Sequence, residues 1–331
     1  MKKLILSLAA VVSMTVSAIA ADVKGAVVYD LGGKNDKSFN EAAYTGAERF
    51  KKETGLEYKD FEIQNDAQRE QAMRRFAKDG YNPIVAIGFS QAAALEKVSK
   101  EFPDTKFAIV DMVVDAPNVR SVLFSEHEGS YLVGVMAAKA SKTGKVGFVG
   151  GMDIPLIRKF ACGYVQGVKS VNPDAEVFQN MTGTTGAAWN DPVKGAELAK
   201  SQFDRGADVV YHAAGGTGIG VLQAAADAGK LGIGVDSNQN GMHPGSVLTS
   251  MLKRVDNAVY NAFMDVKDGK WSAGFNILGL KEGGVGYAMD DNNAKLVDAD
   301  MKAAVDGAAD KIKSGDVKVH NYMDDSKCPA S

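Results

Sequence analysis

PIVAIGFSQAAALEKVSKEFPDTKFAIVD, residues 83–111, carries the clearest fold signal in the chain. Two short apolar runs, at 84–87 and 107–110, flank a segment from about 91 to 101 that has the apolar spacing of a helix. Each run is apolar at nearly every position, which is typical of a strand buried on both faces. A buried strand, a helix and a second buried strand predict a parallel β–α–β unit.

The same alternation extends in both directions from this unit. Upstream, strand patterns at 25–30 and 61–65 precede helix patterns at 38–53 and 67–78, and a further strand pattern lies at 119–124. Downstream the alternation restarts with helix patterns at 129–140, 156–171, 193–205 and 218–228, and strand patterns at 145–151, 175–180, 209–215 and 231–237. The sequence therefore predicts two doubly wound α/β units with parallel sheets.

The C-terminal part of the chain contains strand patterns at 246–253 and 275–289 and helix patterns at 255–267 and 292–314. No Pro- or Ser-rich linker separates the two units. We therefore expect these segments to pass between the units, which produces several hinge crossings and a cleft between two lobes. The predicted lobes are 21–124 with 254–280 (N-terminal) and 125–253 with 281–331 (C-terminal).

Residues 1–20 have the features of a secretory signal peptide. Two lysines precede the apolar segment LILSLAAVVSMTVSAIA at 4–20, and its end matches an A-x-A cleavage site between Ala20 and Ala21. A membrane anchor is the alternative, but the segment is shorter than the roughly 20 apolar residues that span a bilayer. Because no Cys follows the cleavage site, we expect an exported protein that is not lipidated.

Composition and charge argue against several classes of partner. Charged residues make up 24% of the chain and the formal net charge is -3, which disfavours nucleic acid or an anionic membrane surface. The four histidines lack metal-binding spacing, so we expect neither a metal nor a cofactor. Cys162 and Cys328 are the two cysteines, and either a disulfide or two separate thiols fits an exported protein.

Two glycine-rich segments do not match nucleotide-binding motifs. GGKND at 32–36 lacks the upstream glycine and the hydroxyl residue after lysine that a phosphate-binding loop requires. GGTGIG at 215–220 lacks the spacing of a dinucleotide site. Nucleophilic catalysis has little support, because there is no G-x-S-x-G sequence. A nucleoside hydrolase with paired carboxylates stays open as an alternative.

Polar and aromatic side chains gather where the predicted strands end. Asp30, Asp111 and Asp236 each end an apolar run, and ligands of such sheets bind outside the carboxyl ends of the strands. Phe39 and Trp189 lie in polar, glycine-rich loops near helix starts. Taken singly, such an Asp is a helix cap and such an aromatic is a hydrophobic staple. Together they predict a cleft that stacks a flat ring and binds its polar groups.

Four segments carry a family resemblance: DLGGKNDKSFNEAAYTG at 30–46, GGMDIPLIRKFACGYVQGVKSVNPDAEV at 150–177, WNDPVKGAELAKSQFDRGADVVYHAAGGTGIGVLQAA at 189–225, and GVDSNQN at 234–240 with LTSMLKRVDNAVY at 248–260. They resemble the basic membrane protein (BMP) family, ABC-transporter substrate-binding proteins similar to the purine nucleoside receptor A. The resemblance extends over 22–320. It implies a type I periplasmic-binding-protein fold whose two lobes close on a purine nucleoside without catalysis.

The resemblance also implies a set of ligand-binding positions. In this chain they are Asp30, Phe39, Asn40, Asp111, Trp189, Gly215, Asp236 and Lys253. Phe39 and Trp189 would enclose the base, although many members have Phe in place of Trp189. Asp236 and Lys253 would contact one end of the ligand, and the other residues would support its remaining polar groups. Taken alone, Lys253 in the segment MLKR is more typical of a solvated lysine.

A partner and a location follow from the same resemblance. The chain is expected to be a monomer, free in a periplasm, that delivers its ligand to an ABC transporter permease in the inner membrane. Some relatives are thought to bind riboflavin, so a receptor for riboflavin or another flat-ring ligand stays open as an alternative.

Overall fold

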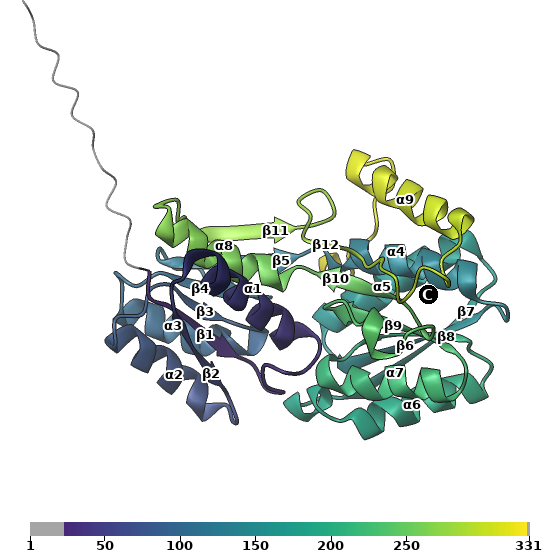
Figure 1. Cartoon of the computed structure of the whole chain (residues 1–331), viewed down its shortest axis with the longest axis horizontal. Helices are drawn as coiled ribbons and strands as arrows, with labels where there is room; N and C mark the ends of the chain where they lie inside the picture. Colours follow the sequence, from purple (N-terminus) through teal and green to yellow (C-terminus); the bar gives the residue numbers. More distant parts are fainter. Residues whose placement is uncertain (1–22, 330–331) are drawn as a thin grey trace, which may run out of the picture.

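The computed structural model describes residues 23–329, which contain two six-stranded sheets, one in each lobe (Figure 1). The first sheet contains β1 (Gly25–Tyr29), β2 (Tyr58–Glu62), β3 (Ile84–Ala86), β4 (Phe107–Val110), β5 (Val119–Phe124) and β11 (Gly274–Leu278). The second contains β6 (Lys145–Met152), β7 (Glu176–Gly183), β8 (Val209–Ala213), β9 (Leu231–Asp236), β10 (Val247–Lys253) and β12 (Val285–Tyr287).

Both sheets arrange their strands in the same way. The first has the order β11-β5-β4-β3-β1-β2 and the second β12-β10-β9-β8-β6-β7, so β4 and β9 occupy equivalent places. Strand pairs are parallel except for the antiparallel pair of β10 and β12. The predicted pair of doubly wound parallel sheets is therefore confirmed.

Helices cover both faces of each sheet. In the N-terminal lobe, α1 (Phe39–Thr54) packs beside α8 (Val255–Lys267), and α2 (Ala67–Lys78) packs beside α3 (Ala92–Glu101). In the C-terminal lobe the pairs are α4 (Glu126–Ala140) with α5 (Pro155–Val171), and α6 (Pro192–Asp204) with α7 (Gly218–Asp227). The last helix, α9 (Ala299–Ser314), packs on α4 (Figure 1).

The apolar runs are continuous because each strand of the sheet interior is buried on both sides. In β1, Val27 and Tyr29 belong to one core with residues of α1 and α8, whereas Ala26 and Val28 belong to a second core with residues of α2 and α3. Successive side chains of a strand point to opposite faces, so both faces of β1 require apolar residues.

The chain passes between the two sheets three times among residues 23–329. The crossings lie between β5 and α4, between β10 and α8, and between β11 and β12. Several crossings between two lobes are typical of a hinge. The residue boundaries of the lobes, 21–124 with 254–280 and 125–253 with 281–331, stay a prediction.

Three predicted element boundaries are wrong. The strand expected at 61–65 lies at β2, and the helix expected from 129 begins at Glu126. The last helix begins at 299 rather than 292, because the Asp298 side chain accepts a hydrogen bond of 2.8 Å from the backbone N–H of Met301 and caps the helix there. Upstream, the Asp290 carboxylate accepts from the backbone N–H of Asn292 at 2.7 Å and holds a turn.

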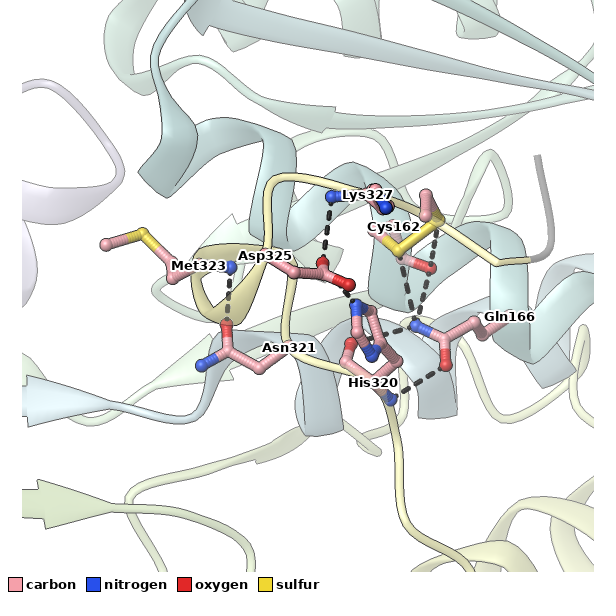
Figure 2. The surroundings of a disulfide bond; sticks show 8 residues. Cys162, Gln166, His320, Asn321, Met323, Asp325 and Lys327 are labelled. Carbon is pink, nitrogen blue, oxygen red and sulfur yellow. Dashed lines mark hydrogen bonds and ion pairs between the residues drawn. A yellow bond between two sulfur atoms is a disulfide. The ribbon is translucent and has the colours of Figure 1, made fainter.

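A disulfide joins Cys162 on α5 to Cys328 in the C-terminal tail, which resolves the alternative left open by the sequence (Figure 2). One turn further along α5, the Gln166 side chain donates to the backbone carbonyl of His320 at 3.0 Å and accepts from its N–H at 2.8 Å. The tail is therefore fixed to α5 by a covalent bond and by a pair of hydrogen bonds.

No helix between residues 23 and 329 is long and apolar enough to cross a membrane. The predicted signal peptide at 1–20 lies outside the described residues and stays a prediction.

Candidate functional site

A cavity lies between the lobes at the carboxyl ends of the strands. It contains roughly 600 Å³ of space, a figure that includes its opening to solvent. All eight predicted ligand-binding residues line it: Asp30, Phe39, Asn40, Asp111, Trp189, Gly215, Asp236 and Lys253. Further lining residues that the sequence did not indicate include Asp36, Phe89, Leu156, Ile157 and Phe160.

Asp111 and Asp236 occupy equivalent places in the two lobes. Asp111 directly follows β4 and Asp236 ends β9, and both have left-handed backbone conformations, with φ of 72° and 63°. Few residues other than Gly adopt this conformation, although Asp and Asn do so more readily than most. The turn at each strand end brings the carboxylate to the cavity, where both residues are lining groups.

Lys253 is the cation of the cavity wall and is almost completely buried. Its ammonium lies 2.6 Å from the Asp111 carboxylate and 2.9 Å from the Glu126 carboxylate. Three aromatic rings surround it, with centroids 5.0 Å (Phe39), 5.3 Å (Phe124) and 5.6 Å (Phe160) from Nζ. Lys253 is therefore a paired, buried charge rather than the solvated lysine that its local sequence favours.

Burial sets the ionisation of these groups. It raises the pKa of Asp236 from 3.8 to about 7, although Lys253 and the Ser38 hydroxyl act in the opposite direction. Burial also raises the pKa of Asp111, against the attraction of Lys253. For Lys253, burial lowers the pKa, but Asp111 and Glu126 outweigh it and the pKa is raised. The cavity thus contains a charged lysine beside an aspartate that titrates near neutral pH.

Asp30 and Asn40 form one wall of the cavity, but their polar side-chain atoms already have protein partners. The Asp30 carboxylate accepts from Arg69 at 2.7 Å and from the Ser90 hydroxyl at 2.6 Å. The Asn40 amide oxygen accepts from the Asp30 backbone N–H at 3.1 Å. These bonds fix the loop that follows β1 against α1 and α2. Asp30 and Asn40 therefore hold the wall in place by bonding to neighbouring protein groups.

Asp36 fixes the start of α1 beside the cavity. Its carboxylate accepts from the backbone N–H groups of Ser38 at 2.8 Å, Asn40 at 3.0 Å and Glu41 at 3.0 Å. These donors otherwise lack helical partners, so the carboxylate satisfies the helix N-terminus and orients Phe39, which lies in its first turn. An acidic residue just before a helix pattern was the available sequence signal.

The opposite wall carries Trp189, which ends a short 3-10 helix, η2 (Gly186–Trp189). Its indole lies directly on Gly151 in β6, so close that a side chain at that position would displace the ring. Gly215, with φ of 56°, lies next to the Trp189 backbone in a left-handed conformation that glycine tolerates without strain. By contrast, Trp271 lies away from the cavity and stacks on Arg120, 4.2 Å from the guanidinium.

The lobes also contact each other directly beside the cavity. The Ser38 hydroxyl of the N-terminal lobe donates to the Asp236 carboxylate of the C-terminal lobe, and the Ser237 hydroxyl donates to the Ser38 carbonyl at 2.9 Å. The Gln239 amide donates to the Lys37 carbonyl at 2.9 Å. We call these contacts, from 37–38 to 236–239, the interlobe latch. They describe a closed arrangement of the two lobes.

Glu126 and Lys159 lie behind the cavity wall and were missed by the sequence reading. Glu126 is the first residue of α4 and Lys159 lies within α5, in patterns that resemble ordinary helix surfaces. Both are buried, and the Lys159 ammonium lies 2.5 Å from the Glu126 carboxylate. Only the long-range packing of α4, α5 and β10 reveals that Glu126 contacts the cavity lysine and that Lys159 contacts Glu126. Among residues 23–329, no group of His, Cys, Asp and Glu side chains is arranged to hold a metal ion.

Comparison with known proteins places the chain in a family. A model of the family described as ABC transporter substrate-binding protein PnrA-like (Bmp) matches residues 23–321. The chain belongs to the Bmp family. It is therefore a substrate-binding protein of an ABC transporter and not an enzyme, which confirms the predicted family and excludes the hydrolase alternative.

Individual Bmp relatives agree with this assignment. The chain is 36% identical over 323 residues to the ABC transporter nucleoside-binding protein BmpA of Lactococcus lactis, covering 91% of each protein. A solved ABC transporter solute-binding protein from Aeropyrum pernix has 32% identity and a TM-score of 0.83, over 92% of this chain and 95% of that one. The predicted type I periplasmic-binding-protein fold is confirmed.

The predicted cellular location is wrong. A relative from Pyrococcus abyssi, 37% identical over 81% of this chain and 69% of its own length, is named an uncharacterized lipoprotein, and two further Pyrococcus relatives carry the same description. These names contradict the expectation of an exported Bmp protein free in a periplasm and not lipidated, and we withdraw it. That expectation relied on the residues next to the predicted cleavage site, which lie outside the described part of the chain. Neither the fold nor the cavity determines whether a lipid is attached there.

Proposed function

We propose that this Bmp protein binds a purine nucleoside in the cavity between its lobes and, as a monomer, delivers it to the permease of its ABC transporter. The family supports a small-molecule ligand and a permease partner. The nucleoside is supported by the Lactococcus lactis relative, which is named a nucleoside-binding protein.

The observation that carries the proposal is an unused acceptor beside aromatic walls. Asp111 Oδ1 is buried and has no hydrogen-bond partner among residues 23–329, although the other oxygen of this carboxylate binds Lys253. A buried acceptor without a donor is unfavourable by about 1–3 kcal/mol. A ligand hydroxyl or N–H group would supply the donor, while Phe39 and Trp189 offer rings for a flat base.

The roles proposed for the cavity residues follow from their free atoms. Phe39 and Trp189 contact the faces of the base. Asp236 and Lys253 contact one end of the ligand, and Asp111 accepts from a hydroxyl or N–H group. Asp30, Asn40 and Gly215 act mainly by shaping the walls, because the polar side-chain atoms of Asp30 and Asn40 already have protein partners.

Isothermal titration calorimetry on ligand-stripped protein tests the proposal. We expect saturable binding of at least one of adenosine, guanosine and inosine, and loss of most of that affinity in Asp111→Asn, which keeps the shape of the side chain but removes its charge. Asp265→Asn, in the N-terminal lobe and outside the cavity lining, serves as the matched control. Absence of heat with all three nucleosides, or tighter binding of riboflavin than of any nucleoside, would overturn the proposal.

A further inference from the structure

Four buried charges form a row that leads from the cavity into the protein. Asp111 pairs with Lys253 at 2.6 Å, Lys253 with Glu126 at 2.9 Å, and Glu126 with Lys159 at 2.5 Å. The side chains of Asp111 and Lys253 line the cavity, whereas those of Glu126 and Lys159 do not. The exposed fractions of the four side chains lie between 0% and 8%, so none of these charges is screened by bulk water.

Three members of this row are attached to the crossings between the lobes. Glu126 begins α4, just after the crossing that leaves β5, and Lys253 ends β10, just before the crossing to α8. The Lys159 ammonium also donates to the backbone carbonyl of Phe124, the last residue of β5, at 2.9 Å. Lys159 therefore holds Glu126 and the end of β5 in one arrangement.

We infer that Glu126 and Lys159 are positioning residues, which fix the Lys253 ammonium so that it stays available to the ligand. Neither contacts the ligand itself. The inference rests on the proposed function, because it explains what orients Lys253, the lysine that we propose contacts the ligand. It adds to the binding site two residues, Glu126 and Lys159, that do not line the cavity.

The reason is a competition among the acids around Lys253. Asp111, Glu126 and Asp236 all attract its ammonium, and Asp111 and Asp236 lie on the cavity side. Glu126 attracts it from behind the wall. Without Glu126, the ammonium would move toward Asp111 and Asp236, which then become less available as acceptors for the ligand. Lys159 keeps Glu126 ionised, since it and Lys253 lower the pKa of Glu126 to about 2 despite burial.

Four variants test this inference. Glu126→Gln removes the charge at nearly constant shape, Lys159→Met removes the partner charge, and Lys159→Arg retains it. We expect Glu126→Gln and Lys159→Met to weaken nucleoside binding by about tenfold to a hundredfold, the loss found when a partner that orients a metal ligand is removed. Lys159→Arg should restore most of the affinity. The double variant Glu126→Gln/Lys159→Met leaves no unpaired inner charge, and should fold and still bind weakly.

Asp265→Asn is the matched control, because Asp265 pairs with the buried Arg120 at 2.6 Å in the N-terminal lobe, and neither residue lines the cavity. It should lower the melting temperature without changing nucleoside affinity. The inference is overturned if the double variant binds with parental affinity, or if Lys159→Arg binds no better than Lys159→Met at equal melting temperature.

A ligand-free measurement separates failure of this inference from failure of the proposed function. The Lys253 ammonium should give a protected ¹⁵Nζ–H NMR signal, identified by its loss in Lys253→Arg. Glu126→Gln should shift this signal and speed its hydrogen exchange, whereas Asp265→Asn should leave it unchanged. If no nucleoside binds the parental protein but the signal responds in this way, the proposed ligand is wrong and the positioning role stands. An unchanged signal in Glu126→Gln refutes the positioning role.

Discussion

Gly151→Ala is expected to disable one wall of the cavity without changing any residue that faces the ligand. An added Cβ would lie 2.1 Å from Cζ3 and 2.4 Å from Cε3 of Trp189. Carbon atoms in contact normally stay about 3.5–4.0 Å apart, so the indole must move by about 1.5 Å. Gly151 does not need a left-handed backbone, so the new methyl group acts through the ring alone.

Such a movement removes much of the stacking that the proposed base makes with Trp189. Stacking of a base on an aromatic ring contributes about 1–3 kcal/mol, so nucleoside affinity should fall by about fivefold to a hundredfold. Calorimetry measures this loss. In a Trp271→Phe background, Trp189 is the remaining tryptophan of the chain, and a shift of its emission in ligand-free Gly151→Ala reports the movement directly.

Gly183→Ala is the control, since a Cβ there would meet the Cβ of Ala188 at an ordinary 3.6 Å. It should leave both affinity and emission unchanged. The reasoning fails if Gly151→Ala keeps parental affinity and parental Trp189 emission while remaining folded.

Three further predictions concern the cavity and the tail. Trp189→Ala should weaken nucleoside binding by about fivefold to a hundredfold, whereas Trp271→Ala, outside the cavity, should not; equal losses in calorimetry would contradict the proposed stacking. The raised pKa of Asp236, about 7, means that the native state keeps a proton that the unfolded chain releases above its ordinary value of 3.8, so stability falls as pH rises from 4 to 7. Asp236→Asn should reduce that fall by up to about 4 kcal/mol, measured as the free energy of unfolding by denaturant at each pH. The same pH dependence in variant and parent would refute the raised pKa of Asp236. Cys328→Ser opens a disulfide that links residues 166 apart, so thermal unfolding should show a loss of about 2–5 kcal/mol, and an unchanged melting temperature would count against the tail as a stabilising element.

Most of the fold could be predicted because local periodicity and burial agree. Continuous apolar runs such as 84–87 require cover on both faces, and helices of matching length supply it. Errors arose where a local side chain sets the boundary. The Asp298 cap starts α9, and a cap can be recognised only when the backbone geometry around it is known.

The cavity lining was predicted for the residues at strand ends, because parallel strands direct their carboxyl ends to one edge. Residues within helices were harder. Phe160 and Lys159 belong to a 17-residue helix with many buried positions, and nothing in its periodicity indicates which positions reach the cavity. Glu126 was missed for a similar reason, since a glutamate at a helix start is usually a solvated partner of the helix dipole.

The interlobe latch has a thermodynamic consequence for every ligand of this protein. Two of its hydrogen bonds, donated by Ser237 and Gln239, join residues that do not line the cavity, so the closed arrangement has a free energy of its own, separate from any ligand contact. The apparent dissociation constant equals the intrinsic one divided by the fraction of molecules able to bind. A change at Ser237 or Gln239 would thus scale the affinities for all ligands by a common factor and leave their ranking unchanged. Selectivity and overall affinity are therefore separable in this protein, the first set by the cavity wall and the second adjustable at the interlobe latch.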